Sequence, residues 1–325
     1  MSEHEVAASG RLDRLIWSLV AATAVAVAAA CLVSDFHIGW RSFLVPSVGC
    51  AVLLAAAWFY GRWRAEARLA SGLACTAQLV AFAAAAAPLS YVAAAFALPL
   101  QDGWFDAMDQ ALGLDWQALL QRMNQWPALF AVLRPIYLSL MVQMTVAVLC
   151  LAFSGRLIRL RVYTLAFIFA TLTTILVSAL LPAAGAWPHF GLTAADSPHL
   201  VPSVQTSWPV FYGLRDGSLR LLVGAGSEGI ITFPSLHAAL AVILIASLWP
   251  VPVLRWAVLV LNVLMLAATP IDGSHYFIDV FAGMALALPC LIAARAAAAR
   301  PEAVRVATAA SEIRQFVGSE EQISL

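Results

Sequence analysis

Eight long apolar runs divide this chain, and they restrict it to a small set of folds. A helix needs about 20 apolar residues to cross the hydrocarbon core of a bilayer. Hydrophobic residues make up 62% of the sequence and charged residues only 11%, whereas soluble domains carry about a quarter charged residues. The sequence therefore predicts an all-α integral membrane protein with about eight transmembrane helices. The expected spans are residues 15–33, 43–60, 69–98, 128–153, 162–181, 236–249, 256–269 and 277–294.

The segment 101–126, between the third and fourth runs, is too polar to cross a membrane. It contains four aspartates, Asp102, Asp106, Asp109 and Asp115. Its apolar residues recur at helical spacing, which is typical of an amphipathic helix lying in the membrane interface. The sequence leaves open whether this helix cushions the bundle or gates access to it.

The 18 basic residues are all arginines, and their placement predicts the orientation of the helices. Arginine clusters follow the second, fourth and eighth runs, and cytoplasmic links are the ones enriched in basic residues. We therefore expect both termini in the cytoplasm of a cell whose plasma membrane, such as a bacterial inner membrane, holds the protein. With eight spans, His237 and His275 then lie at the same, outward-facing end.

The segment from Phe233 to His237 places a serine and a histidine at the start of the sixth run. Serine is a favoured N-cap residue, and proline is tolerated where a helix begins. The free N–H groups of the first helical turn then form a site suited to an anion such as phosphate. His237 would lie beside that anion, although an ordinary capped helix with an interfacial histidine fits the same residues.

The segment from Gly273 to Asp279 precedes the eighth run in a similar way. His275 and Asp279 are four residues apart, so they share one face of a helix. A carboxylate bonded to one imidazole nitrogen fixes the tautomer and leaves the other nitrogen as a base or nucleophile. The alternative is a polar pair that ties two helices together. Ionisable groups at membrane helices are costly, which favours one functional site built from both segments.

The two segments resemble motifs of the type 2 phosphatidate phosphatase superfamily. One of its motifs reads Pro-Ser-Gly-His, and Pro-Ser-Leu-His stands at 234–237 here. Another motif ends in His-x3-Asp, and His-Tyr-Phe-Ile-Asp stands at 275–279. With leucine in place of the motif glycine, this segment resembles the branch of the superfamily that contains the inositol phosphorylceramide synthases. These enzymes are inositolphosphotransferases. The resemblance covers roughly residues 102–294.

The resemblance implies a role for each matching residue. His275 corresponds to a nucleophile that forms a phosphohistidine, and Asp279 to the carboxylate that orients it. His237 corresponds to the acid that protonates the departing alcohol and then to the base that activates the acceptor. Ser235 corresponds to part of the phosphate cradle. The resemblance implies no metal and no cofactor, and the expected partners are a lipid phosphate and the bilayer, with no nucleic acid.

The cationic part of the family site is not recognisable here. The position of its motif arginine falls at Thr269, and Arg134-Pro135 matches another motif only without its lysine, since Pro127 stands there. Arg215 and Arg220 lie on the outer loop that leads to Ser235. We therefore expect Arg134, Arg215 and Arg220 to be the candidates for phosphate binding.

The resemblance also implies a domain organisation. We expect a six-helix phosphatase-type core preceded by two additional N-terminal helices. Residues 1–100 then hold the first three spans, 101–126 the interfacial segment, 127–294 the catalytic membrane core with an outer loop at 183–232, and 295–325 a cytoplasmic tail.

The expected function is that of a lipid phosphatase or phosphotransferase acting at the extracytoplasmic face. One alternative is transfer of an inositol-phosphate-type headgroup to a lipid alcohol. Another is a transporter that uses the His/Asp group as a proton relay, although the matching pairs of broken helices typical of transporters are not recognisable. A catalytically inactive relative is a third alternative. The oligomeric state is left open.

Overall fold

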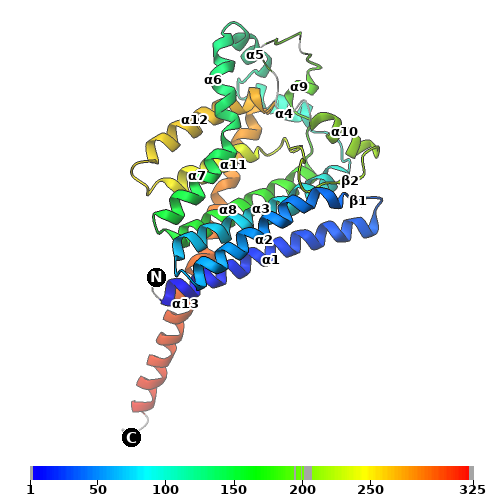
Figure 1. The fold of residues 1–325 in the computed structure, drawn as a ribbon. Coiled ribbons are helices and arrows are strands. Elements are labelled where there is room, and N and C mark those ends of the chain that lie inside the picture. The colour runs from blue at the N-terminus through cyan, green and yellow to red at the C-terminus, as the bar shows by residue number, and fades with distance from the viewer. Residues whose placement is uncertain (1–2, 194, 199, 201–206, 322–325) are drawn as a thin grey trace.

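The computed structural model describes residues 3–193, 195–198, 200 and 207–321, and the side chains of residues 4–299 among them. The fold is a bundle of helices (Figure 1), with 76% of the residues helical, which confirms the all-α expectation. The helices are α1 (Glu3–Val33), α2 (Trp40–Arg62), α3 (Ala67–Ala94), α4 (Asp102–Ala111), α5 (Trp116–Asn124), α6 (Pro127–Leu138), α7 (Leu140–Phe153), α8 (Leu157–Leu180), α9 (Ala186–His189), α10 (Ser207–Asp216), α11 (Leu236–Leu248), α12 (Arg255–Asp272) and α13 (Phe277–Glu321). The strands β1 (His37–Ile38) and β2 (Leu221–Leu222) form a short parallel ladder.

Six helices are long and apolar enough to cross a membrane on their own: α1, α2, α3, α8, α12 and α13. Helices α6 and α7 pass the same test only as a pair, which is bent by 44°. Helix α11 has 13 residues, or about 20 Å, and is shorter than the hydrocarbon core of about 30 Å. Of the eight expected spans, six are therefore confirmed as single helices, the fourth is a bent pair, and the sixth is a short helix.

The bend between α6 and α7 has a local cause at Ser139. Its hydroxyl donates to the carbonyl of Ile136 at 2.6 Å, and its backbone N–H donates to the same carbonyl at 3.2 Å. That carbonyl would otherwise accept the N–H of Leu140 in a continuous helix. Serine back-bonding of this kind bends helices.

The segment 101–126 forms two short helices, α4 and α5, instead of the single amphipathic helix that we expected. The chain turns at Gly113, whose φ of 74° lies in the region that glycine adopts without a steric cost. Asp115 then caps α5 by accepting the N–H of Ala118 at 2.9 Å. A glycine followed by an N-cap aspartate is a helix stop and start signal, and it divides the segment.

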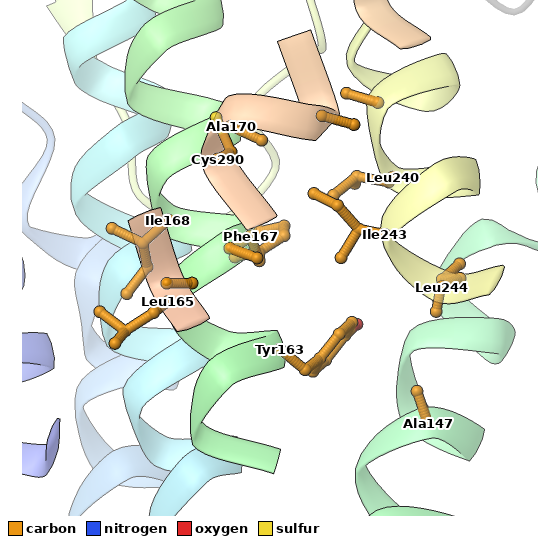
Figure 2. Close-up of a cluster of buried hydrophobic side chains, with 14 of the residues drawn as sticks. Ala147, Tyr163, Leu165, Phe167, Ile168, Ala170, Leu240, Ile243, Leu244 and Cys290 are labelled. Carbon is orange, nitrogen blue, oxygen red and sulfur yellow. The ribbon is translucent and has the colours of Figure 1, made fainter. Parts of the chain in front are cut away.

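Helix α8 lies at the centre of the bundle and packs against α1, α3, α11 and α13. Figure 2 shows Phe167 of α8 directed toward Leu240 and Ile243 of α11, within one hydrophobic cluster. Leu12 and Ile16 of α1 belong to the same cluster and are fully buried. Helix α2, in contrast, has no buried residue and covers the outside of the bundle.

The links between helices gather at two opposite ends of the bundle. At one end, named the arginine end, Arg68 donates to the carbonyl of Phe153 and Arg156 donates to the carbonyl of Pro250. The other end, named the histidine end, holds the β1–β2 ladder and the α12–α13 link with His275. This arrangement agrees with helices that alternate in direction. The orientation relative to a membrane stays a prediction, as do the domain divisions.

Candidate active site

Ser235 begins α11 and organises the first half of the site. Its Oγ accepts the backbone N–H of Ala238, so Ser235 is the N-cap that the sequence predicts. The backbone of Ser235 is also held from α13, because its N–H donates to the carbonyl of Asp279 at 3.0 Å. The capped turn therefore lies directly against the second half of the site.

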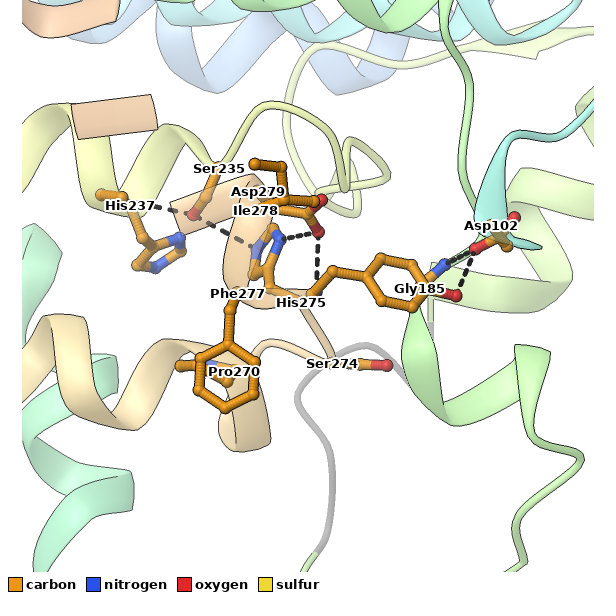
Figure 3. Close-up of polar contacts among 12 residues, drawn as sticks. Asp102, Gly185, Ser235, His237, Pro270, Ser274, His275, Phe277, Ile278 and Asp279 are labelled. Atoms are coloured by element: carbon orange, nitrogen blue, oxygen red, sulfur yellow. Dashed lines mark hydrogen bonds and ion pairs between the residues drawn. The ribbon is translucent and has the colours of Figure 1, made fainter. Parts of the chain in front are cut away.

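His275 and Asp279 form the pair that their spacing predicts. The Nδ1 atom of His275 lies 3.1 Å from a carboxylate oxygen of Asp279, and the same oxygen accepts the N–H of Tyr276 at 2.9 Å. With the proton on Nδ1, the Nε2 lone pair points toward Ser235 Oγ, 3.4 Å away. Figure 3 shows Ser235, the N-cap of α11, and His237 of its first turn facing His275 and Asp279. His275 is 4% exposed, and its burial lowers the pKa of the imidazole, which favours the neutral, nucleophilic form.

Gly283 permits this close approach of α11 and α13. A Cβ atom at this position would overlap the carbonyl oxygen of Ser235 and would lie 3.0 Å from the Cβ of Ala238. Any larger residue would push the two helices apart. The distance between Ser235 and His275 therefore depends on a glycine one turn beyond Asp279.

His237 lies beside this pair and is held by a tyrosine. Its ring stacks on Tyr137 of α6, with ring centroids 4.3 Å apart and an interplanar angle of 14°. The Tyr137 hydroxyl lies 3.5 Å from Nδ1 of His237. Tyr137 therefore contacts one of the two histidines directly.

Two buried aspartates of α4 hold the segment around His275, and the sequence did not indicate this role. Asp109 accepts the N–H groups of Phe277 at 2.7 Å and Ile278 at 2.8 Å, at the first turn of α13. Asp109 is fully buried, and burial raises the pKa of its carboxyl group, while these two bonds act in the opposite direction. A carboxylate at the positive end of a helix is favourable, so α4 acts as a clamp on the start of α13.

Asp102 makes a second connection from the same helix. It accepts the N–H of Ala184 at 3.0 Å, the N–H of Gly185 at 2.8 Å and the hydroxyl of Tyr276 at 3.1 Å. Ser274 joins the same two segments, because its carbonyl accepts the N–H of Ala186 at 2.9 Å. The link that carries His275 is therefore fixed from α4 and from the residues that follow α8.

We expect Asp109→Ala to lower kcat by about 10- to 100-fold while KM stays within about twofold, because small displacements of a reacting group are costly. Steady-state kinetics on a lipid phosphate measure this, and Asp109→Asn, which keeps one acceptor, should restore part of the rate. The control is Asp106→Ala, a half-buried aspartate on the same helix that bonds Gln110. An unchanged kcat in folded Asp109→Ala would contradict the positioning role.

A mainly apolar cavity of about 410 Å³ opens beside the histidines. Leu236, His237 and His275 line one part of its wall, and the rest comes from α3, α6, α8 and residues 227–231. Phe82, Ala83 and Ala87 are among its apolar residues. A cavity of this kind fits the apolar part of a lipid next to a polar reacting group.

The three candidate arginines lie in different surroundings. Arg134 of α6 lies one turn before Tyr137 and interacts electrostatically with Asp272, at the end of α12. Arg215 donates to the carbonyl of Leu98 at 2.7 Å, and Arg220 donates to the carbonyls of Leu214, in α10, and Leu219. None of the contacts described for these arginines reaches His237 or His275.

Two further residues, His189 and Thr269, lie near the site. His189 lies on α9, where its ring is 6.1 Å from the ring of Tyr276. Thr269, which stands at the position of the family's motif arginine, is buried and bonds the carbonyl of Met265 within its own helix. Among the described residues, no group of three His, Cys, Asp or Glu side chains is placed to hold a metal ion.

The geometry defines a helical membrane protein with a buried His–Asp pair beside an N-capped helix and an apolar cavity. Residues 103–293, more than half of the chain, match the family profile of the PAP2 superfamily. The chain therefore belongs to the PAP2 superfamily, whose members are phosphoesterases. No curated protein and no solved structure shows significant similarity to the chain. The superfamily expected from the two motifs is confirmed, and the match does not distinguish the branch.

Proposed function

We propose that the protein cleaves phosphate esters of lipids through a phosphohistidine on His275. The observation that carries this proposal is the convergence of Ser235, His237, His275 and Asp279 beside a mainly apolar cavity that the two histidines line. This arrangement supplies a nucleophile, a group that orients it, an acid and an anion cradle.

The reaction proceeds in two steps. In the first, His275 Nε2 attacks phosphorus, the bond from phosphorus to the alcohol oxygen breaks, and His237 gives that oxygen a proton. In the second, His237 takes a proton from water or from another alcohol, which attacks the phosphohistidine and breaks its P–N bond. Asp279 holds the proton on Nδ1 and stabilises the charge that the ring gains.

The N–H groups of the first turn of α11 are the proposed donors to the phosphate oxygens, apart from that of Ala238, which Ser235 Oγ accepts. Arg134 is the candidate cation that the structure supports best, because it lies one turn from Tyr137, which stacks on His237. It also interacts with Asp272, which precedes the His275 link. Arg215 and Arg220 hold backbone carbonyls and are better explained as supports of the outer loop.

Hydrolysis is the first assignment for the second step, since water needs no binding pocket of its own. Transfer to an alcohol, as in the inositolphosphotransferases, is the alternative that the Pro-Ser-Leu-His motif favours. A screen of purified protein with phosphatidate, isoprenyl pyrophosphate and ceramide-type substrates, with and without inositol, distinguishes them. Phosphate release independent of inositol supports a phosphatase, whereas inositol phosphate formed from the same lipid phosphate only when inositol is present supports a transferase. We place this reaction at the extracytoplasmic face of the plasma membrane.

The apolar cavity should determine the preference for lipid substrates. We expect Ala87→Phe, which fills the cavity from α3, to lower kcat/KM for a long-chain lipid phosphate by about 10-fold or more. The same variant should change kcat/KM for a short, water-soluble phosphate ester by less than about twofold, since that substrate needs only the part of the cavity beside the histidines. Kinetics on the two substrates measure the difference.

The matched control is Ala84→Phe on the same helix. Ala84 lines a separate apolar cavity between α1, α2 and α3, away from the histidines. If Ala84→Phe and Ala87→Phe impair the long-chain substrate equally, the cavity beside His237 is not the lipid site.

A further inference from the structure

A second cavity, of about 330 Å³, lies at the arginine end of the bundle. It opens where the start of α8, the end of α11 and the middle of α13 meet the beginning of α1. Figure 1 shows the beginning of α1 beside α13 in this region. Along α13, Arg295 follows Asp279 by 16 residues, which is about 24 Å, so this cavity is separate from the histidines.

Three arginines line this cavity: Arg156, Arg159 and Arg295. Arg156 is held by the carbonyl of Pro250 at 2.7 Å, and Arg159 by the carbonyl of Ala246 at 3.3 Å. Arg295 of α13 is exposed at the cavity wall and repels Arg159, as does Arg156. Like charges gathered from two helices are unfavourable unless an anion compensates them.

The acidic lining is smaller than the basic lining. Glu5 is the one acidic residue among the described residues of the cavity wall, and it is exposed. The cavity therefore carries three positive charges and one negative charge. The excess is positive, and the space is large enough for a phosphate group.

Ser9 provides an independent observation. Ser9 is among the residues that line the cavity and is 5% exposed, and its Oγ has no hydrogen-bond partner among the residues that the structure describes. A buried hydroxyl without a partner is unusual and costs about 1–3 kcal/mol. A bound phosphate oxygen within the cavity would give this hydroxyl an acceptor.

We propose that the cavity formed by Arg156, Arg159, Arg295 and Ser9 binds a phosphate group, as an anionic phospholipid headgroup or as free phosphate. Basic pockets between transmembrane helices bind such headgroups at the membrane surface. The site lies at the opposite end of the bundle from the proposed reaction and does not depend on it.

Two probes test the proposal on purified protein in a neutral detergent: a fluorescent phosphatidylglycerol and radiolabelled inorganic phosphate. Each arginine near a membrane surface contributes about 1 kcal/mol, so we expect the double substitution Arg159→Gln/Arg295→Gln to weaken binding about 30-fold. Arg295→Gln alone should weaken binding of the probes about fivefold. Because Arg295 is exposed, this single variant should fold even if the double variant does not.

The matched control is Arg255→Gln, at the same end of the bundle. Arg255 is exposed, packs over Trp256 and does not line the cavity, so its substitution should leave binding within about twofold. Selective loss of phosphatidylglycerol binding identifies a lipid headgroup, and selective loss of inorganic phosphate binding identifies the free ion. Absence of binding to the unmodified protein, or equal binding by all variants, would overturn the proposal.

Discussion

Replacing His275 with asparagine is expected to lower the turnover of a lipid phosphate by about 10⁴-fold or more, because the phosphohistidine cannot form. In the native site, Nδ1 of His275 lies 3.1 Å from a carboxylate oxygen of Asp279. The amide group of asparagine can take the place of Nδ1 and still donate a hydrogen bond to Asp279. The fold should therefore be preserved, which a thermal unfolding measurement checks. Phosphate release from purified protein measures the activity.

The control for this substitution is His189→Asn. His189 lies near Tyr276 but outside the contacts that join Ser235, His275 and Asp279. We expect it to retain activity within about threefold. Activity close to that of the unmodified protein in His275→Asn would remove His275 as the nucleophile.

The second large effect is expected from His237→Asn, and it should depend on the leaving group. For an alkyl alcohol, which needs a proton to depart, the rate should fall by about 10²- to 10⁴-fold. For 4-nitrophenyl phosphate, whose leaving group needs no proton, the first-turnover release of nitrophenol should fall by less than about 10-fold. If His237 acts as an acid, the rate falls much more for the alkyl alcohol than for nitrophenol. If His237 only binds substrate, the two rates fall equally.

Tyr137→Phe keeps the ring that stacks on His237 and removes the hydroxyl at 3.5 Å from Nδ1. This control should change both rates by less than about fivefold. Equal losses for the two leaving groups in His237→Asn would contradict the proton-transfer role and would leave His237 as a binding residue.

The local parts of this site could be predicted from the sequence because they depend on short spacings. The Ser235 cap follows from its position before an apolar run, and the His275–Asp279 contact follows from their separation by one helical turn. The alternation of long apolar runs predicted that both motifs reach one end of the bundle. The structure confirms these features.

The parts that depend on distant residues could not be predicted. Asp102 and Asp109 look like the polar face of an interfacial helix, and nothing local shows that they are buried against residues more than 80 positions away. The bend at Ser139, one turn after Pro135, involves a side-chain hydrogen bond to Ile136 within a run that is long enough to form a single span. The contacts of Arg215 and Arg220 depend on how the outer loop folds over α3 and β1, which composition does not determine.

The measurement that tests the central claim most directly is trapping of the phosphoenzyme. Purified protein is mixed with a ³²P-labelled lipid phosphate and denatured in alkaline detergent. We predict protein-bound label that is stable in base and labile in acid and that is absent in His275→Asn. In His237→Asn, where both steps lack the proton-transfer group, we expect label to accumulate from ³²P-labelled 4-nitrophenyl phosphate, whose leaving group needs no proton. Label that persists in His275→Asn, or its absence from both the unmodified protein and His237→Asn, would contradict a phosphohistidine on His275.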